Sequence, residues 1–395
     1  MPLTNREDIL TRAVEEIIIK KEFEKNLNEQ KPLRLKMGFD PSAPDIHLGH
    51  TVGLRKLRQL QELDHKVVLI VGDWTAQIGD PSGRSQTRKM ITSEEVNSNA
   101  QTYLDQFFKI VDKDKTEIRW QSEWFGDFNL NNIIHLTSNF TVAQILARDD
   151  FSKRYKSNHP ISITELLYPL LQAYDSLVIE SDVEFGGSDQ RFNLLLGREL
   201  QESHGKKPQH CFIMPLLPGT DGIQKMSKSL GNYIGINEPP NDIFGKIMSI
   251  PDDLITSYFS WLTDYSSKDV HSISKELESH LVNPINHKKD LARTIVSNLY
   301  DGAAANSATI YFEETIQQGK TPTNIPQYAL SSNTNFKLSN VLVETGICQS
   351  SGEARRLISQ GAIRLNDIVI TSNIKTESLT PGTIRAGRRK YLRLT

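Results

Sequence analysis

The sequence predicts an α/β fold in which a doubly wound parallel sheet is followed by an α-helical domain and a small α+β module. Two observations predict this order: buried strands alternate with amphipathic helices in the first half of the chain, and helical segments with few strand signals follow them. The third observation is a short basic tail with both helix and strand patterns. At 395 residues, the chain is long enough for two or three domains.

The first elements have a β-α-β pattern. Residues 33–39 read as a short strand, residues 48–63 as an amphipathic helix, and residues 66–72 (KVVLIVG) as a buried strand that stops at a glycine. Weaker strand signals lie at 117–120 and 211–214. Apolar strands separated by helices are typical of a Rossmann-like parallel sheet covered on both faces. Ligands bind beyond the carboxyl ends of such strands, so the loops that follow the strands are the first places to search for a site.

Helical patterns dominate after the sheet. Segments 252–262, 267–281 and 288–299 each have helical periodicity with few strand signals. We therefore expect a Rossmann-like domain over residues 1–235 and a helical domain over residues 236–320.

The tail is expected to be a separate unit. Residues 321–335 are rich in Thr, Asn, Ser and Pro without apolar periodicity, which indicates a linker. Residues 336–395 then combine both element types, which predicts an α+β module. Its expected elements are helices at 338–345 and 352–360 and strands at 362–365, 367–371 and 391–394.

The charge of the chain is small but unevenly distributed. Forty-six Lys and Arg residues against 48 Asp and Glu residues give a net charge of −2. Residues 336–395 contain ten basic and four acidic residues, so the tail carries +6 and the rest of the chain −8. A basic module on an acidic body is typical of a surface that binds phosphate backbones, although a solvated basic face has the same composition.

The composition excludes several classes of protein. With 37% hydrophobic and 24% charged residues, the chain is neither disordered throughout, collagen-like, nor a membrane bundle. Residues 1–30 are charged throughout and contain no apolar signal segment. Cys211 and Cys348 are too few for a disulfide framework or a four-ligand zinc site. We therefore expect a protein of the cytoplasm that holds no structural metal.

The loop after the first strand, residues 38–50 (GFDPSAPDIHLGH), is the first candidate site. His47 and His50 lie three positions apart at an expected helix N-terminus, on one face, beside amide donors and the positive end of the helix dipole. That arrangement favours a phosphate, and Gly49 would let a flat ligand approach the backbone closely. Taken alone, the same residues could be a helix cap with two surface histidines.

The loop of residues 219–231 (GTDGIQKMSKSLG) is the second candidate. Lys225 and Lys228 could place two ammonium groups on a polyphosphate, while the hydroxyls of Ser227 and Ser229 and nearby amides complete the cradle. The flanking glycines would let this segment move. A solvent-exposed basic loop is the alternative for any single Lys-x-x-Lys pair.

Together the two loops resemble a known family. His47-Leu48-Gly49-His50 is similar to the HIGH signature of class I aminoacyl-tRNA synthetases, and residues 225–229 are identical to their KMSKS signature. The two occur in the family's order, 178 positions apart. The resemblance implies that His47, His50, Lys225 and Lys228 are catalytic, and that ATP is bound by His47, Gly49, His50, Lys225, Ser227, Lys228 and Ser229.

A third cluster indicates the amino acid. Tyr168, Gln172 and Asp175 follow one another at i, i+4 and i+7, which is one face of a helix. A buried carboxylate needs a donor, so the stripe either faces solvent or lines a polar pocket. The stripe resembles the Y-x-x-x-Q-x-x-D arrangement of tyrosyl-tRNA synthetases. The resemblance implies that Asp175 accepts the phenol proton of tyrosine and that Tyr168 and Gln172 help to hold its ammonium group.

Two further stretches resemble the same family, residues 77–83 (QIGDPSG) and 185–190 (FGGSDQ). We expect both to be glycine-bearing loops with a carboxylate, which could equally be turns whose aspartate caps local amides. The resemblance implies that Asp80 contacts the ammonium group of the amino acid. It further implies the following contacts: Asp189 with the ribose of ATP, Gln190 with tyrosine or the adenylate, and Asp40 and Ser42 beside ATP.

One position departs from the family pattern. Many bacterial tyrosine enzymes have a tyrosine before Cys-Gly-Phe-Asp that donates to the substrate hydroxyl, whereas this chain has Lys36 before Met37-Gly38-Phe39-Asp40. We expect Lys36 at the tyrosine site, where it either neutralises Asp175 or points elsewhere.

The tail resembles a small RNA-binding module that many bacterial tyrosine enzymes carry at this end. The resemblance rests on residues 351–358 (SGEARRLI) and 361–366 (GAIRLN). It implies a phosphate-binding surface for tRNA, to which Arg385 and Lys390 could add. The expected tRNA-binding residues are Arg355, Arg356, Arg364, Arg388 and Arg389.

The resemblance implies tyrosine activation by ATP, with Mg²⁺ bound to the ATP, followed by transfer to the terminal adenosine of tRNA. No side-chain nucleophile is needed, and we expect catalysis by positioning and by cationic stabilisation from His47, Lys225, Lys228 and Mg²⁺. It also implies a homodimer, with residues 128–151 as a possible interface. Three alternatives stay open: a tryptophan synthetase, a non-catalytic paralogue that binds structured RNA, and a small-molecule nucleotidyltransferase.

Overall fold

The computed structural model describes residues 6–29, 31–42, 45–82, 91–280, 282–320, 325–330, 336–387 and 390–395. The chain divides into two compact units, residues 1–301 (unit 1) and residues 302–395 (unit 2). Unit 1 holds the expected Rossmann-like domain together with most of the expected helical domain, and the last helix of that domain falls in unit 2. The division into four parts stays a prediction.

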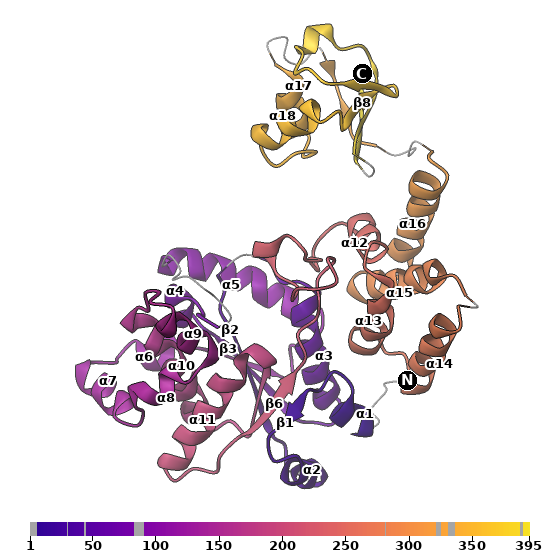
Figure 1. Ribbon diagram of the computed structural model, residues 1–395. Coiled ribbons are helices and arrows are strands. Elements are labelled where there is room, and N and C mark those ends of the chain that lie inside the picture. The colour runs from indigo at the N-terminus through magenta and orange to yellow at the C-terminus, as the bar shows by residue number, and fades with distance from the viewer. Residues whose placement is uncertain are drawn as a thin grey trace. The chain divides into compact units, whose positions relative to one another are not determined.

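Unit 1 is built on a six-stranded sheet with the order β1-β6-β5-β2-β3-β4. Its strands pair in parallel except for the short edge strand β1, which is antiparallel to β6. Helices lie on both sides of the sheet (Figure 1). The strands are β1 (Glu16–Ile17), β2 (Arg34–Phe39), β3 (Lys66–Val71), β4 (Thr116–Trp120), β5 (Val183–Gly187) and β6 (His210–Met214).

The strand order places a topological switch point between β2 and β5. After β2 the chain adds β3 and β4 on one side, and it then returns to add β5 and β6 on the other side. In open α/β sheets, the crevice at such a point, beyond the carboxyl ends of the strands, is where ligands bind.

Local sequence explains where the helices around this crevice begin. His47 caps α3 (Leu48–Gln61) and Ser162 caps α10 (Ile163–Val178), each in a reciprocal capping box with the third residue of its helix. Helix α4 ends at Gly79, whose φ of 78° is a backbone conformation that residues with a side chain rarely adopt. The remaining helices before β6 are α1 (Arg6–Thr11), α2 (Lys20–Asn28), α4 (Thr75–Ile78), α5 (Ser93–Phe107), α6 (Ser122–Phe125), α7 (Leu130–Thr137), α8 (Val142–Leu146), α9 (Asp149–Lys156) and α11 (Arg191–Ser203).

Helices follow the sheet in unit 1, as the periodicity predicts. Helix α12 packs against α15, and α13 packs against α14 and α15. Their bounds are α12 (Pro240–Ile247), α13 (Ile255–Leu262) after a short 3₁₀ turn (Asp252–Leu254), α14 (Ser267–Glu278) and α15 (Pro284–Leu299). In the part of the chain that the structure describes, no helix is both long and apolar enough to span a bilayer.

Unit 2 contains a five-stranded sheet with the order β7-β11-β10-β8-β9 and its own apolar core. Strand β7 falls within residues 321–335, the expected linker. It belongs to the folded module all the same, because Tyr328 is buried in this core and β7 pairs in parallel with β11. The elements are α16 (Gly302–Phe312), a π-helical turn (Glu313–Gln317), β7 (Gln327–Tyr328), α17 (Leu338–Glu344), α18 (Ser351–Ser359), β8 (Ile363–Leu365), β9 (Ile368–Ile370), a 3₁₀ turn (Thr376–Ser378), β10 (Gly382–Ala386) and β11 (Lys390–Leu394).

Candidate active site

A cleft of about 870 Å³ opens beyond the carboxyl ends of β2 and β5. The two signature loops both line it, although they lie far apart in the sequence. The expected site residues that line this cleft are Asp40, Ser42, His47, Gly49, His50, Asp80, Tyr168, Gln172, Asp175, Asp189, Gln190, Lys225, Ser227, Lys228 and Ser229.

The two histidines of the first signature cap the start of α3. His47 Nδ1 accepts a hydrogen bond from the Gly49 amide at 3.2 Å, and His50 Nδ1 accepts one from the His47 amide at 3.2 Å. Each imidazole therefore uses its Nδ1 as an acceptor, so in the neutral ring Nε2 carries the proton. Both rings thus offer a neutral N–H donor to a ligand in the cleft.

The expectation that His47 contributes a positive charge to catalysis stays a prediction, and the ligand-free cleft disfavours that charge. Burial, with a smaller contribution from His50 and the two signature lysines, lowers the pKa of His47 far below its usual range. Burial and Lys228 together lower the pKa of His50 to about 4. Both histidines are therefore neutral at physiological pH, and the positive charge of the site comes from lysines.

The second signature spans the cleft from one strand end to the other. Lys225 Nζ lies 2.6 Å from Asp189 Oδ2, just after β5. Lys228 Nζ donates to the backbone carbonyl of Asp45, in the loop after β2, and lies 5.4 Å from the centroid of the Tyr103 ring. The two lysines are thus held at two different strand ends of the cleft.

The signatures also pack closely against each other. A Cβ on Gly49 would lie 3.0 Å from the His47 ring and 3.7 Å from Met226 Cβ. Gly49 therefore leaves room for the capping histidine and for the second signature loop as well as for a ligand.

The polar stripe of α10 faces the cleft rather than solvent. Tyr168 donates to Asp40 Oδ2 at 2.8 Å, and the Asp175 carboxylate accepts from Gln121 Nε2 at 2.8 Å and from Trp124 Nε1 at 3.1 Å. Burial raises the pKa of Asp175 to about 7, although Lys36 and the Gln121 donor act in the opposite direction. A carboxylate held in this way is a strong acceptor for a further buried hydroxyl.

Gln172, the middle residue of the stripe, contacts a second group of polar side chains. Gln172 Oε1 and Gln190 Oε1 each accept a hydrogen bond of 3.0 Å from Asn193 Nδ2. Gln190 Nε2 donates to Asp80 Oδ2 at 2.6 Å. The cleft thus has one carboxylate at the Asp175 end and another at the Asp80 end.

Lys36, expected at the tyrosine site, lies beneath the cleft instead. Its ammonium is buried against Glu184 Oε1 at 2.9 Å, and the partner of Lys36 is therefore Glu184 rather than Asp175. Side chains alternate along a strand, so Lys36 points toward α10 and α11 whereas Met37 packs against Gly53 of α3 on the other face. Direct contact between Lys36 and tyrosine is thus a wrong expectation.

Several polar residues of the site gave no sequence signal. Glu184 lies on β5 and Asn193 on α11, outside every motif of the sequence analysis, and the expected loop at 185–190 is partly strand β5 followed by a 3₁₀ turn (Ser188–Gln190). Gln121 follows β4, and its position at a strand end is the one signal that could have identified it.

The basic tail residues lie in unit 2. Arg355, Arg356 and Arg364 are exposed, whereas Arg388 and Arg389 lie outside the described residues. Arg364 on β8 pairs directly opposite Arg385 on β10. Two like charges in this cross-strand position repel each other, and a bound phosphate would relieve that repulsion.

The fold and the cleft are those of a class I aminoacyl-tRNA synthetase. Residues 28–317 match the family of class I tRNA synthetases for W and Y, and residues 315–393 match the tyrosine–tRNA ligase SYY-like C-terminal domain. The tyrosine–tRNA ligase of Dehalococcoides mccartyi is 55% identical over 98% of this chain and 97% of its own length. That of Carboxydothermus hydrogenoformans is 46% identical over 98% and 97%.

Within that class, the chain belongs to the tyrosine–tRNA ligase family. Solved structures share the fold. A tyrosyl-tRNA synthetase of Archaeoglobus fulgidus complexed with L-tyrosine has a TM-score of 0.62 at 23% identity, covering 77% of this chain and 99% of its own. A truncated mitochondrial enzyme of Aspergillus nidulans has a TM-score of 0.65 at 18% identity, covering 79% and 93%.

Proposed function

We propose that this protein activates L-tyrosine with ATP to tyrosyl-adenylate and then transfers tyrosine to the terminal adenosine of tRNA(Tyr). The observation that carries the proposal is the convergence of both signatures on the cleft that also contains Asp175. In the first step the tyrosine carboxylate attacks the α-phosphate and pyrophosphate leaves. In the second step a ribose hydroxyl of the tRNA attacks the acyl carbon and AMP leaves.

The chain would catalyse activation by placing donors where negative charge develops. His47 and His50 offer neutral N–H groups from one wall, and Lys225 and Lys228 offer ammonium groups from the loop that spans the cleft. Such preorganised donors act mainly in the transition state. Mg²⁺ would arrive with ATP as part of the substrate, and in the described part of the chain no cluster of three His, Cys, Asp or Glu side chains could hold a metal by itself.

Tyrosine would lie between the two carboxylates of the cleft. Its phenol would donate to Asp175, and its ammonium group would meet Asp80, with Tyr168, Gln172 and Gln190 around it. The buried acceptor at the phenol end favours tyrosine over phenylalanine, because phenylalanine leaves the carboxylate without that donor. The same acceptor is a poor match for the apolar six-membered edge of an indole, which disfavours tryptophan.

Unit 2 would bind tRNA through its basic side chains. Arg355, Arg356, Arg364, Arg388 and Arg389 are the proposed contacts, and the Arg364–Arg385 pair is the strongest local support for them. Charging of tRNA serves protein synthesis, so the proposal places the protein in the cytoplasm.

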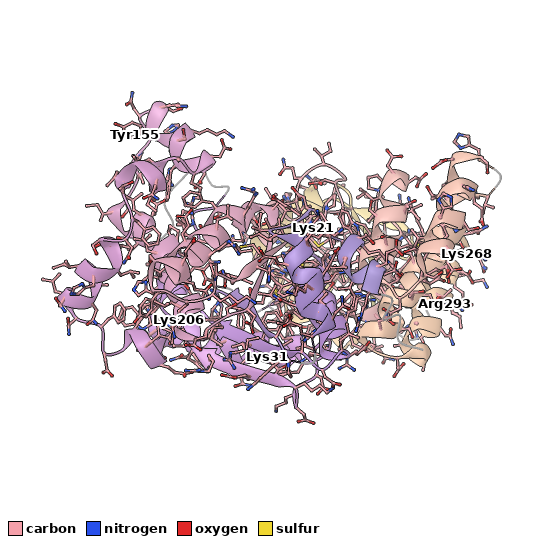
Figure 2. All side chains as sticks on the ribbon, turned by 90° about the horizontal axis from the view of Figure 1, so that it is seen from below. Lys21, Lys31, Tyr155, Lys206, Lys268 and Arg293 are labelled. Carbon is pink, nitrogen blue, oxygen red and sulfur yellow. The ribbon has the colours of Figure 1, made fainter. Side chains whose placement is uncertain are left out.

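We further propose a homodimer formed through an apolar surface of unit 1 that starts from the expected interface, residues 128–151, and extends to Ile163. Five exposed side chains on α7, α8, α9 and α10 define this surface, and Tyr155 is labelled in Figure 2. Exposed apolar side chains on neighbouring helices are typical of a protein interface, and here α7 contacts α10 while α8 contacts α9. The members of this apolar surface are Leu130, Ile134, Val142, Tyr155 and Ile163.

ATP–pyrophosphate exchange with each amino acid in turn, beside charging of total tRNA, tests the proposal. Exchange with tyrosine and formation of tyrosyl-tRNA are expected. Exchange with tryptophan would favour the tryptophan enzyme, exchange without tRNA charging would favour a small-molecule nucleotidyltransferase, and RNA binding without exchange would favour a non-catalytic paralogue.

A further inference from the structure

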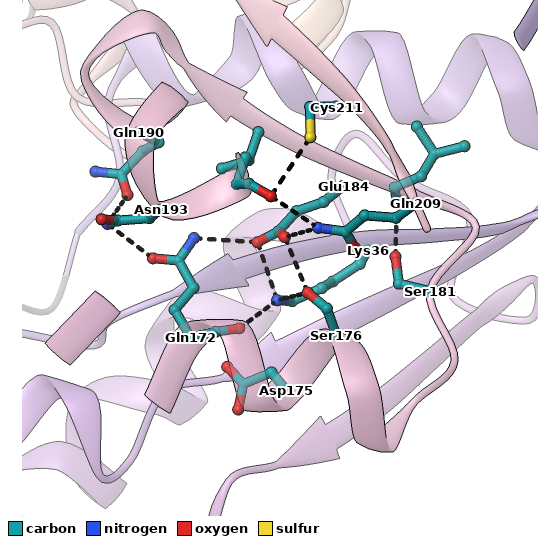
Figure 3. A network of polar contacts seen from close by, with 12 residues as sticks. Lys36, Gln172, Asp175, Ser176, Ser181, Glu184, Gln190, Asn193, Gln209 and Cys211 are labelled. Atoms are coloured by element: carbon teal, nitrogen blue, oxygen red, sulfur yellow. Dashed lines mark hydrogen bonds and ion pairs between the residues drawn. The ribbon is translucent and has the colours of Figure 1, made fainter. Parts of the chain in front are cut away.

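We propose that Lys36 is a positioning residue for the ammonium group of the amino acid, acting through Glu184 to fix which end of the Gln172 amide faces the cleft. The inference rests on the proposed function and deepens it, because it assigns a role to a buried ion pair that touches neither tyrosine nor ATP. It is carried by a continuous network of polar contacts beneath the cleft (Figure 3).

The Lys36–Glu184 pair is completely enclosed. The two side chains are 0% and 1% exposed, and Nζ lies 2.9 Å from Glu184 Oε1. Lys36 Nζ also donates to Ser176 Oγ at 2.7 Å and to the Gln172 backbone carbonyl at 2.9 Å. A buried ion pair gains little stability over apolar side chains of the same volume, so its presence at this place suggests a different role.

The Glu184 carboxylate acts only as a hydrogen-bond acceptor, and it contacts several side chains of the network. Its Oε1 receives Gln172 Nε2 at 3.0 Å in addition to Lys36, and its Oε2 receives Ser176 Oγ at 2.9 Å and Gln209 Nε2 at 2.5 Å. An ionised carboxylate has no proton to give, so the Gln172 amide must turn its nitrogen toward Glu184. Its carbonyl oxygen therefore points the other way.

Charged groups fix two neighbouring amides in the same manner. Arg148 can only donate, and its Nη1 lies 3.2 Å from Asn193 Oδ1, so the Asn193 nitrogen faces the two glutamines. The Asp80 carboxylate accepts from Gln190 Nε2, which leaves the Gln190 carbonyl toward Asn193. Each of the three amides is thus oriented by a charged group that can only donate or only accept hydrogen bonds.

The consequence is a site made of acceptors. Among the described residues, the Gln172 and Gln190 carbonyl oxygens each accept a side-chain hydrogen bond from Asn193, which leaves each a second lone pair for a ligand, and both residues line the cleft with Asp80. An ammonium group has three donors and no acceptor, so it matches this arrangement. If the Gln172 amide turned over, it would present N–H groups to a cation.

Removing Lys36 would loosen this constraint. A Glu184 carboxylate without its buried counter-charge would leave an uncompensated charge, and the network would have to rearrange around it, which frees the Gln172 amide to adopt the reversed orientation. The surroundings leave little room for another rearrangement, because a Cβ on Gly197 of α11 would already lie 2.8 Å from Gln209 Nε2 and 2.9 Å from Ser176 Oγ.

The test compares two ligands that differ at the ammonium group. L-Tyrosinol carries the ammonium and the phenol, whereas 3-(4-hydroxyphenyl)propan-1-ol is the same molecule without the ammonium. Binding to the full chain is followed by tryptophan fluorescence, since Trp124 contacts Asp175 in the same cleft. Lys36→Met should weaken tyrosinol binding about tenfold, the effect of one hydrogen bond to a charged group, and leave the propanol affinity nearly unchanged.

A double variant separates orientation from stability. Lys36→Met combined with Glu184→Gln leaves no unpaired buried charge, so the thermal stability lost in the single variant should return in part. A Gln side chain at position 184 can donate as well as accept, so the selective loss of tyrosinol binding should persist. If the single variant fails to fold, the double variant carries the comparison.

Lys56→Met is the matched control. Lys56 is also a buried lysine, but its Nζ donates to the backbone carbonyls of Asp8 and Ile9. The control should not change the ratio of the two affinities. Equal weakening of both ligands in the Lys36 variants, or recovery of tyrosinol binding together with stability, would overturn the inference. Wild-type protein without tyrosine-dependent exchange would instead overturn the proposed function.

Discussion

Lys225 Nζ lies 2.6 Å from Asp189 Oδ2, so a lysine of the second signature is paired with the carboxylate that is proposed to bind the ribose of ATP. Both side chains are partly exposed at the mouth of the cleft. ATP would have to separate the pair, and the released lysine would then be free to meet the phosphates. Because the pair is partly exposed, breaking it costs little, about 1 kcal/mol or less.

Lys228→Ala tests the role of this loop. The substitution should slow adenylate formation about 10²–10³-fold, because one preorganised donor to the transition state is lost. The dissociation constant of tyrosine should change little. Single-turnover formation of adenylate measures the first quantity, and equilibrium dialysis measures the second.

Lys206→Ala is the control for that experiment. Lys206 is an exposed lysine that pairs with Glu180 and is labelled in Figure 2, and it is not among the residues that line the cleft. Its removal should leave both quantities unchanged. An unaltered rate of activation in Lys228→Ala would contradict the catalytic assignment.

The pKa of Asp175, raised to about 7, predicts a pH-dependent choice between tyrosine and phenylalanine. Below pH 7 the carboxyl of the free protein is mostly protonated and tolerates either ligand, whereas above pH 7 the carboxylate favours the phenol donor. The preference for tyrosine should therefore rise with pH between about 5.5 and 7, by at most about tenfold per unit, and then level off.

Dissociation constants of the two amino acids across that pH range measure the effect without ATP. In Asp175→Asn the preference should be small and independent of pH, because the group that titrates has been removed. The histidines do not interfere, since the pKa of His50 is about 4 and that of His47 is lower still. A pH-independent preference in the wild-type protein would place phenol recognition elsewhere.

The Arg364–Arg385 pair predicts a tRNA contact that is separate from activation. Arg364→Ala should weaken tRNA binding and reduce the salt dependence of log K by about one unit, as expected for one lost phosphate contact. Tyrosine-dependent pyrophosphate exchange should not change. Filter binding over a range of salt concentrations provides the measurement.

Asp367→Asn is a control for which the opposite effect on tRNA binding is expected. This residue lies in the turn between β8 and β9 at φ 65°, a conformation that Asn adopts well, so the substitution removes one negative charge without straining the backbone. It should strengthen tRNA binding slightly. Identical behaviour of the two variants would rule out an electrostatic contact.

The apolar surface of unit 1 predicts the oligomeric state. Ile134→Asp should convert the proposed dimer to a monomer, because burying an unpaired carboxylate at an interface costs several kcal/mol, of order 2–5. Sedimentation velocity measures the change. Ile310→Asp is the matched control, because Ile310 is 56% exposed on α16 against 55% for Ile134 and lies outside this surface. A wild-type monomer would refute the proposal.

Local patterns in the sequence predict the segments that are proposed to carry the chemistry. The capping histidines, the KMSKS loop and the Tyr168–Gln172–Asp175 stripe are local patterns, and a local pattern fixes residue type and spacing. The β-α-β pattern was equally visible, because alternation of buried strands and amphipathic helices is set by short-range hydrophobic periodicity.

The charges and the contact partners of these groups depend instead on how distant segments pack together. His47 is neutral because of its burial, and that burial is created by segments distant in sequence, including Ile234 and Gly235, which pair with the start of α3. Lys36 meets Glu184 because β2 and β5 are neighbours at the switch point, 148 residues apart in the sequence. The protonation state of a side chain and the group it pairs with depend on contacts between segments distant in the sequence. The spacing of residues within a motif does not reveal those contacts.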